Sequence, residues 1–151
     1  MKAAIYTVNA SAQTVAAGGV LALGSIVRRF GNNRCCVPII NLSGNGIVLS
    51  ECGYYKVDVN VTDAPAAAGA VTVQLYQDGV AVPGAVATNT AAAASDATSV
   101  EVPAIVRVGC ANSTLTAVLV DGAGAGFQHS AVPATDQAAH VDGISECYKK
   151  Y

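Results

Sequence analysis

The strictest pattern in the sequence is an alternation of mainly apolar and mainly polar positions over residues 54–61. One set of alternate positions holds Tyr55, Val57, Val59 and Val61, and the other holds Tyr54, Lys56, Asp58 and Asn60. Successive side chains of a β-strand point to opposite faces of a sheet. The segment is therefore predicted to be a strand with one buried and one exposed face.

The same alternation recurs in segments 71–76, 98–108 and 113–121, which we also predict to be strands. Asp78-Gly79 follows the first of these and predicts a two-residue hairpin turn, because both residue types tolerate positive φ. Two further strands are expected at 36–40 and 47–50, joined by a type I′ turn at Asn45-Gly46. No helical period competes with these patterns, so the fold class is all-β.

The rest of the chain divides into edge strands, loops and a tail. Apolar pieces at 3–8 and 20–27 predict edge strands, and the small-residue segments 62–70 and 84–97 predict loops. Residues 1–130 are expected to form one domain, and residues 131–151 change character. That last segment is either a docking arm for another protein or a loop and final edge strand folded on the domain.

Composition narrows the classes of partner. Only 12% of the 151 residues are charged, against about a quarter in an ordinary soluble domain, which suggests that much of the surface is covered by other subunits. A net charge of −2 argues against nucleic acid. No run approaches the ~20 apolar residues of a membrane span. Met1-Lys2 opens no signal peptide, so we expect synthesis in the host cytoplasm.

Segment 113–121 is apolar on both faces. One face of a strand in a sandwich packs on the opposing sheet, so apolar residues on the second face need another layer or another subunit. We therefore predict a subunit interface that consists of Leu115, Ala117, Val118, Leu119 and Val120.

Several of these segments together resemble the jelly-roll domains of the tumour-necrosis-factor (TNF)/C1q type that end collagen-like bacterial and phage surface proteins, such as exosporium nap filaments. The similarity spans roughly residues 3–130 and is carried by Leu49-Ser50-Glu51-Cys52-Gly53-Tyr54-Tyr55, Val73-Gln74-Leu75-Tyr76, Gly79-Val80-Ala81-Val82-Pro83-Gly84, Val106-Arg107-Val108, Cys110 and Asn112-Ser113-Thr114-Leu115-Thr116. The resemblance implies a Greek-key jelly-roll sandwich of about eight to ten strands that assembles as a homotrimer.

The five cysteines match no zinc-site spacing, and their odd number favours reduced thiols buried as small apolar side chains. A disulfide among Cys36, Cys52 and Cys110 stays open. His129 and His140 lack a partner at ligand or catalytic spacing. We expect no catalytic residues, no metal and no cofactor.

Two residue groups admit a binding role beside a structural one. Arg28, Arg29 and Arg34 are interpreted as a solvated rim or intersubunit ion pairs, with an anionic-ligand patch as the alternative. Tyr54, Tyr55 and Tyr76 are interpreted as half-buried strand residues, with a sugar-binding surface as the alternative.

The sequence leads us to expect a structural protein of the virion surface. It begins without a collagen-like stalk, lacks a catalytic constellation and carries an additional C-terminal segment. We expect a phage capsid decoration protein or head-fibre homotrimer bound to the major capsid protein or another virion protein. The predicted docking residues are Cys147, Tyr148, Lys149, Lys150 and Tyr151, two aromatic anchors and two cations with a cysteine.

Three alternatives remain beside that expectation. A spore-surface or cell-surface trimer of the exosporium type would share the fold and differ in its anchor. A module of a phage fibre that binds a receptor or surface glycans belongs to a different functional class. A hydrolase is the most remote, because no nucleophile and base are paired in the sequence.

Overall fold

A computed structural model describes the backbone of residues 2–11, 13–32, 36–109, 111–122, 127–128 and 138–144, and the side chains of those between residues 3 and 120. The described residues contain no helix, and so none that is long and apolar enough to cross a membrane. The prediction of an all-β chain is confirmed.

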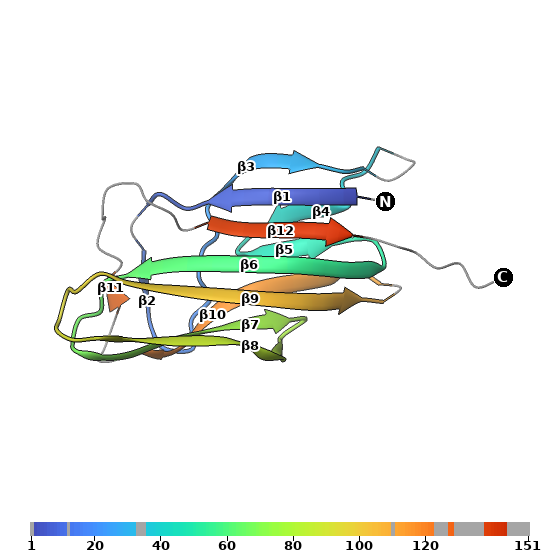
Figure 1. The fold of residues 1–151 in the computed structure, drawn as a ribbon. Coiled ribbons are helices and arrows are strands. Elements are labelled where there is room, and N and C mark those ends of the chain that lie inside the picture. Colours follow the sequence, from blue (N-terminus) through green and yellow to red (C-terminus); the bar gives the residue numbers. More distant parts are fainter. Residues whose placement is uncertain are drawn as a thin grey trace.

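Two five-stranded antiparallel sheets lie face to face (Figure 1). The sheet named here the β6 sheet has the order β3 (Ser25–Phe30), β1 (Lys2–Val8), β12 (Ala138–Ile144), β6 (Gly53–Asp63) and β9 (Thr98–Val108). The second, the β10 sheet, has the order β4 (Ile40–Ser43), β5 (Gly46–Leu49), β10 (Ser113–Gly122), β7 (Gly69–Gln77) and β8 (Val80–Ala91). A small sheet pairs β2 (Thr14–Val15) with β11 (Phe127–Gln128).

Both large sheets place strands that are far apart in the sequence side by side. In the β6 sheet, β12 lies between β1 and β6, and in the β10 sheet, β10 lies between β5 and β7. Such interleaving of late and early strands in two packed sheets is the Greek-key jelly-roll topology. The predicted fold class is therefore confirmed.

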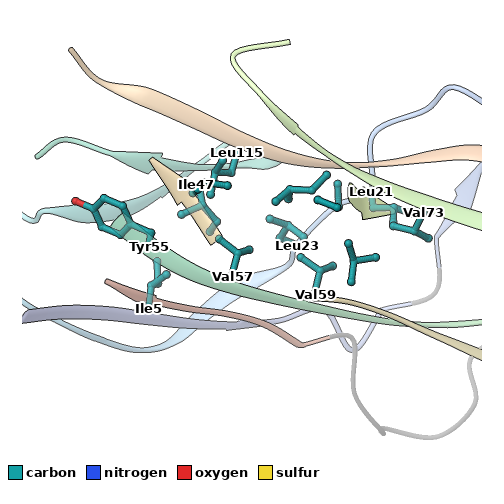
Figure 2. Close-up of a cluster of buried hydrophobic side chains, with 14 of the residues drawn as sticks. Ile5, Leu21, Leu23, Ile47, Tyr55, Val57, Val59, Val73 and Leu115 are labelled. Atoms are coloured by element: carbon teal, nitrogen blue, oxygen red, sulfur yellow. The ribbon is translucent and has the colours of Figure 1, made fainter. Parts of the chain in front are cut away.

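The core lies between the two sheets and is almost wholly aliphatic (Figure 2). Ile5, Val57 and Val59 face it from the β6 sheet, and Ile47 and Leu115 face it from the β10 sheet. Leu21 and Leu23, from the segment between β2 and β3, join the same cluster. Each fully buried aliphatic side chain of this kind contributes roughly 1.5–3 kcal/mol relative to an exposed one.

The alternation in β6 is confirmed residue by residue. Tyr55, Val57, Val59 and Val61 are buried, and the residues between them are exposed or half-buried. The hairpin turn at Asp78-Gly79 is confirmed as well, with φ of 51° and 79°. The Asp78 carboxylate accepts hydrogen bonds from the Thr114 N–H at 2.7 Å and the Ser113 hydroxyl at 2.8 Å, which ties the turn to β10.

Four boundaries differ from the sequence prediction. The edge strand expected at 20–27 lies at Ser25–Phe30. The turn between β4 and β5 is Gly44-Asn45, with φ of 57° at Gly44, and Gly46 is already a buried strand residue. The strand expected at 36–40 instead starts at Ile40. The segment 84–97, expected to be a loop, supplies the second half of β8 up to Ala91, and only residues 92–97 form the loop.

The N-terminal residues are more deeply integrated than edge strands. Lys2–Val8 pairs with β12 on one side and with β3 on the other, so β3 forms the sheet edge. Residues 18–21 pair with β10 through Gly18 N–H to Leu119 O at 2.6 Å and Leu21 N–H to Ala117 O at 2.8 Å. Gly24 then adopts φ of 75° where the chain passes directly over the Val8 carbonyl and Asn9.

The segment assigned to a tail or docking arm contributes a central strand. Ala138–Ile144 pairs along its whole length with β1 and with β6. The alternative of a strand folded on the domain thus holds for these seven residues, although the strand is central and not at an edge. Residues 145–151 lie outside the described part of the chain, and with them the predicted docking residues 147–151.

Candidate interaction surfaces

The five residues predicted to form the subunit interface lie on β10, mostly inside a single chain. Leu115, Ala117 and Leu119 face the core and are at most 2% exposed. Val118, on the outer face of the sheet, is 9% exposed, and its neighbour Val120 is 42% exposed. Of this set, only Val120 offers substantial surface to a second copy of the chain.

The chain itself covers the outer face of β10 around Val118. Val20 forms an antiparallel bridge with Val118 on one side, and Gln74 of β7 lies opposite Val118 on the other. Side chains of directly opposed residues lie on the same face about 5 Å apart. Neighbours in the same chain thus account for an apolar residue on the outer face of β10. Contact of the five predicted residues with a second copy stays a prediction.

Three large apolar side chains are exposed on the outer face of the β6 sheet. Phe30 on β3 and Tyr54 on β6 are each 58% exposed, and Ile105 on β9 is 73% exposed. All three alternate with buried neighbours or pair with outward-facing residues, which places them on the side away from the core. Aromatic residues exposed in this way are enriched in protein interfaces.

A hollow of about 920 Å³ lies beside the β1–β3 pair and is lined by residues 4–6 and 27–30. Its lining combines the rings of Tyr6 and Phe30 with Arg28 and Arg29. Aromatic rings and guanidinium groups together are the side chains that contribute most at protein interfaces. The hollow and Phe30 therefore belong to one candidate interaction surface at the β3 edge.

Of the three arginines of the predicted patch, the two that the structure describes do not share one face. Arg28 pairs with the outward-facing Tyr6, whereas Arg29 pairs with the buried Ile5. The Arg29 Nη1 donates to Asn41 Oδ1 of β4 at 2.5 Å, which links the edges of the two sheets. Arg34 lies outside the described residues. Arg28 and Arg29 thus form no common anion-binding patch on one face of β3.

The three tyrosines of the proposed sugar-binding alternative are likewise separated. Tyr55 is buried, and its hydroxyl donates to the Glu51 carbonyl oxygen at 2.8 Å. Burial, with a smaller contribution from the charge of Glu51, raises the pKa of Tyr55 to about 12. Tyr54 faces outward from the β6 sheet, and Tyr76 is half-buried on β7 of the β10 sheet. They form no single surface.

The described cysteines depart from the prediction of reduced, buried thiols. Cys36 is free but exposed, in a left-handed conformation with φ of 63°. Cys52 is disulfide-bonded. Cys35, Cys110 and Cys147 lie outside the described residues, as do His129 and the side chain of His140. Among the residues described, no three His, Cys, Asp or Glu side chains are grouped to hold a metal ion.

Among the side chains that the structure describes, one carboxyl group is buried, and sequence patterning missed it. Asp63 ends β6 on its inward-facing side and is 5% exposed. Its Oδ1 accepts a hydrogen bond from the Ala64 N–H at 2.7 Å. Burial raises the pKa of Asp63, and the Ala64 hydrogen bond lowers it by a smaller amount. The signal available in the sequence was the continued alternation, which puts position 63 in phase with Val61.

Comparison with solved structures finds the same fold in two groups of proteins. An Eiger TNF protein from S. frugiperda superposes with a TM-score of 0.68 at 8% identity, covering 100% of this chain and 96% of that one. Murine APRIL at pH 5.0 gives 0.62 at 11% identity over 95% and 100% of the two chains. The globular domain of a zebrafish complement 1qA protein gives 0.57 at 10% identity over 99% and 98%.

No protein-family model and no curated protein matches the chain. At 8–11% identity the structural similarity concerns the fold alone. The chain therefore has a TNF/C1q-like jelly-roll fold.

Proposed function

We propose that the chain forms a homotrimer about a three-fold axis and has a structural role on the surface of a virion. Self-association accords with the TNF/C1q-like fold, whose members form homotrimers, and the similar solved structures are TNF and C1q domains and not enzymes. Cyclic assembly of identical chains is the common way in which such a domain covers apolar surface.

The observation that carries self-association is the outer face of the β6 sheet. Phe30, Tyr54 and Ile105 are more than half exposed there, in a chain in which only 12% of residues are charged. Burying a large apolar side chain of this kind contributes roughly 1.5–3 kcal/mol relative to leaving it in water. A second copy that covers all three would gain several such contributions.

The virion is the proposed setting for two reasons. The disulfide at Cys52 favours a protein that works outside a reducing cytoplasm, as a particle does after its release from the cell. The resemblance to phage and bacterial surface proteins points to the same class of location. On the capsid, the trimer would bind the major capsid protein or another virion protein, with the segment around residues 147–151 as the proposed contact.

Light scattering coupled to gel filtration tests the trimer. The purified protein should have about three times the chain mass of 15.1 kDa at micromolar concentration. A folded monomer under these conditions would contradict the proposal. The measurement is best made without reducing agent, so that the disulfide at Cys52 is retained.

Quantitative mass spectrometry of purified particles tests the virion role. A decoration protein should be present in many copies, in a constant ratio to the major capsid protein and in multiples of three. A few copies per particle would indicate a fibre or tail component instead. Recovery from spore coats and not from virions would favour the alternative of a spore-surface trimer.

A further inference from the structure

The cross-strand register of the β6 sheet places exposed residues of its two edges on shared rows. Phe30 lies opposite Ala4, Ala4 opposite Asp142, Asp142 opposite Lys56, and Lys56 opposite Ile105. Phe30, on the edge strand β3, and Ile105, on the edge strand β9, are therefore at the same height along the strands. They are also among the most exposed apolar side chains of the described residues.

Rows on either side carry charges: Arg28 on the β3 edge, and Arg107 and Glu101 in opposite directions from Ile105 on the β9 edge, with Glu101 in the same direction as Arg28. On the β3 edge, Arg28 lies opposite the outward-facing Tyr6, one step along the strand from Phe30. On the β9 edge, Glu101 lies opposite Asn60 and is exposed two steps from Ile105. Neither Arg28 nor Glu101 forms an ion pair within the part of the chain that the structure describes.

A cyclic trimer requires two different surfaces on each chain, because each copy contacts its two neighbours through opposite sides. If the three-fold axis runs along the strands, rotation about it preserves height, so that rows on one copy meet the same rows on the next. The β3 edge of one copy then meets the β9 edge of its neighbour. This brings Phe30 to the height of Ile105, and Arg28 within one row of Glu101.

From this arrangement we infer that the β3 edge of each copy, with the hollow beside it, receives the β9 edge of the next copy. Phe30 packs against Ile105 of the neighbouring copy, and Arg28 pairs with Glu101 of that copy. The inference rests on the proposed trimer and adds to it the contact surfaces and their order around the ring. The hollow of about 920 Å³ supplies the space that the neighbouring edge fills.

Both surfaces have what such a contact requires. The β3 edge offers the apolar Val27 and Phe30 beside a guanidinium group, and residues 25–30 are all exposed. The β9 edge offers a carboxylate and Ile105. Complementary charges set the register and orientation of an interface, whereas the apolar contacts supply most of its affinity.

A charge exchange tests the pairing directly. Arg28→Glu and Glu101→Arg should each raise the trimer dissociation constant by about tenfold or more, because each places like charges opposite one another at all three interfaces. The double variant Arg28→Glu/Glu101→Arg restores opposite charges and should return to within about threefold of the wild-type constant. Thr116→Glu, on the half-buried outer side of β10, is the control and should leave the constant unchanged.

A cross-link tests the row alignment independently of charge. In a Cys36→Ser background, Phe30→Cys/Ile105→Cys should form intermolecular disulfides on mild oxidation and run as a covalent trimer on a non-reducing gel. The single variant Phe30→Cys, in the same background, should not form the covalent trimer. Circular dichroism of every variant checks the fold, which we expect to be retained because all four positions are exposed in the single chain.

The outcomes separate the inference from the trimer itself. A monomeric wild-type protein would contradict both the proposed trimer and the edge-to-edge contact. A wild-type trimer in which both single charge variants keep the wild-type dissociation constant, or in which the cysteine pair gives no covalent trimer, would overturn the edge-to-edge contact and leave the trimer standing. Loss of assembly in both single variants without recovery in the double variant would likewise overturn the pairing of Arg28 with Glu101.

Discussion

The outer faces of the two sheets differ in how their apolar side chains are covered. On the β10 sheet, Val118 is 9% exposed because Val20 and Gln74 flank it within the same chain. On the β6 sheet, Phe30, Tyr54 and Ile105 are at least 58% exposed in the single chain. The outer face of the β10 sheet still leaves Val86 46% and Val120 42% exposed, but the largest exposed apolar side chains lie on the β6 sheet.

Charge follows the same division. With the exception of Asp121 on β10, the charged residues of the strands in the two large sheets belong to the β6 sheet, and they are Lys2, Arg28, Arg29, Lys56, Asp58, Asp63, Glu101, Arg107 and Asp142. The outer face of the β10 sheet carries threonines instead, such as Thr72 and Thr88, whose hydroxyl groups are 2.8 Å apart. Charges that flank exposed apolar groups are the composition of an interface with a polar rim. Threonines whose hydroxyl groups hydrogen-bond across neighbouring strands are typical of a strand face that is exposed to solvent.

The largest expected effect is a loss of stability at Gly24, in the segment that follows the residues paired with β10. Residues 18–24 cover β10, and Gly24 has φ of 75° with the Val8 carbonyl oxygen and Asn9 Cα where a Cβ would lie. Gly24→Ala should lower the free energy of unfolding by more than about 4 kcal/mol, because the obstructing atoms are backbone and cannot rotate away. Urea denaturation at fixed protein concentration measures the change.

Gly18→Ala is the matched control for the glycine prediction. Gly18 has a similar φ of 82° but no atom within 4 Å of the added Cβ. It should cost only the backbone strain of about 1–2 kcal/mol. Equal losses for the two variants would contradict the role of the close approach at Gly24.

Substitution of two adjacent tyrosines on β6 tests the inner and the outer face of the sheet separately. Tyr55 is buried with its hydroxyl bonded to Glu51 O at 2.8 Å, so Tyr55→Ala should cost about 3–5 kcal/mol of stability. Tyr54 is 58% exposed, so Tyr54→Ala should leave the secondary structure intact and weaken assembly instead. Circular dichroism and light scattering on both variants give the two readouts, and a Tyr54→Ala protein that unfolds would show that the outer face is also part of the core.

Strands with a strong alternation were predictable from the sequence, and weakly patterned ones were not. β6, β7, β9 and β10 each have an inward row of Val and Leu that only a strand can bury. β8 lies at a sheet edge, with most of its residues exposed, so its sequence of Ala, Thr and Asn contains no such row and was interpreted as a loop.

Features that depend on contacts between distant segments, such as the position of the β4–β5 turn, could not be predicted from the sequence either. Gly44-Asn45 and Asn45-Gly46 both suit a two-residue turn, and the choice depends on Gly46, where a Cβ would lie 2.7 Å from Thr114 Cγ2 on β10. The cover over Val118 comes from residues 18–21, which show no strand period. The interface was therefore predicted on the strand whose apolar pattern is strongest, and contact of these β10 residues with a second copy stays a prediction. The larger exposed side chains of Phe30, Tyr54 and Ile105 lie on the other sheet.

Two neighbouring valines on β10 test which sheet assembles. Val118→Asp puts a charge at a position that is 9% exposed and should cost about 2–4 kcal/mol of stability. Val120→Asp, at 42% exposure, should change stability by less than about 1 kcal/mol and leave a trimer. A Val120→Asp protein that is stable but monomeric would return the interface to β10 and contradict the contact through the β6 sheet.

The smallest expected effect concerns Asp63, the buried carboxyl group at the end of β6. Burial raises the pKa of Asp63 above its value of about 3.9 in the unfolded chain, so the folded state holds the proton more tightly. The contribution of this group to stability is then fully present below the unfolded pKa and is lost as the pH rises through the folded pKa. Asp63→Asn keeps an oxygen that accepts from the Ala64 N–H and removes the titration.

The pH dependence of that pair of proteins checks the assignment. Between about pH 3 and pH 7, the stability of the wild type should fall relative to Asp63→Asn and then level off. If the stability difference between wild type and Asp63→Asn is constant across this range, Asp63 is hydrated in solution, and the inner face of the β6 sheet is open to water at the end of β6.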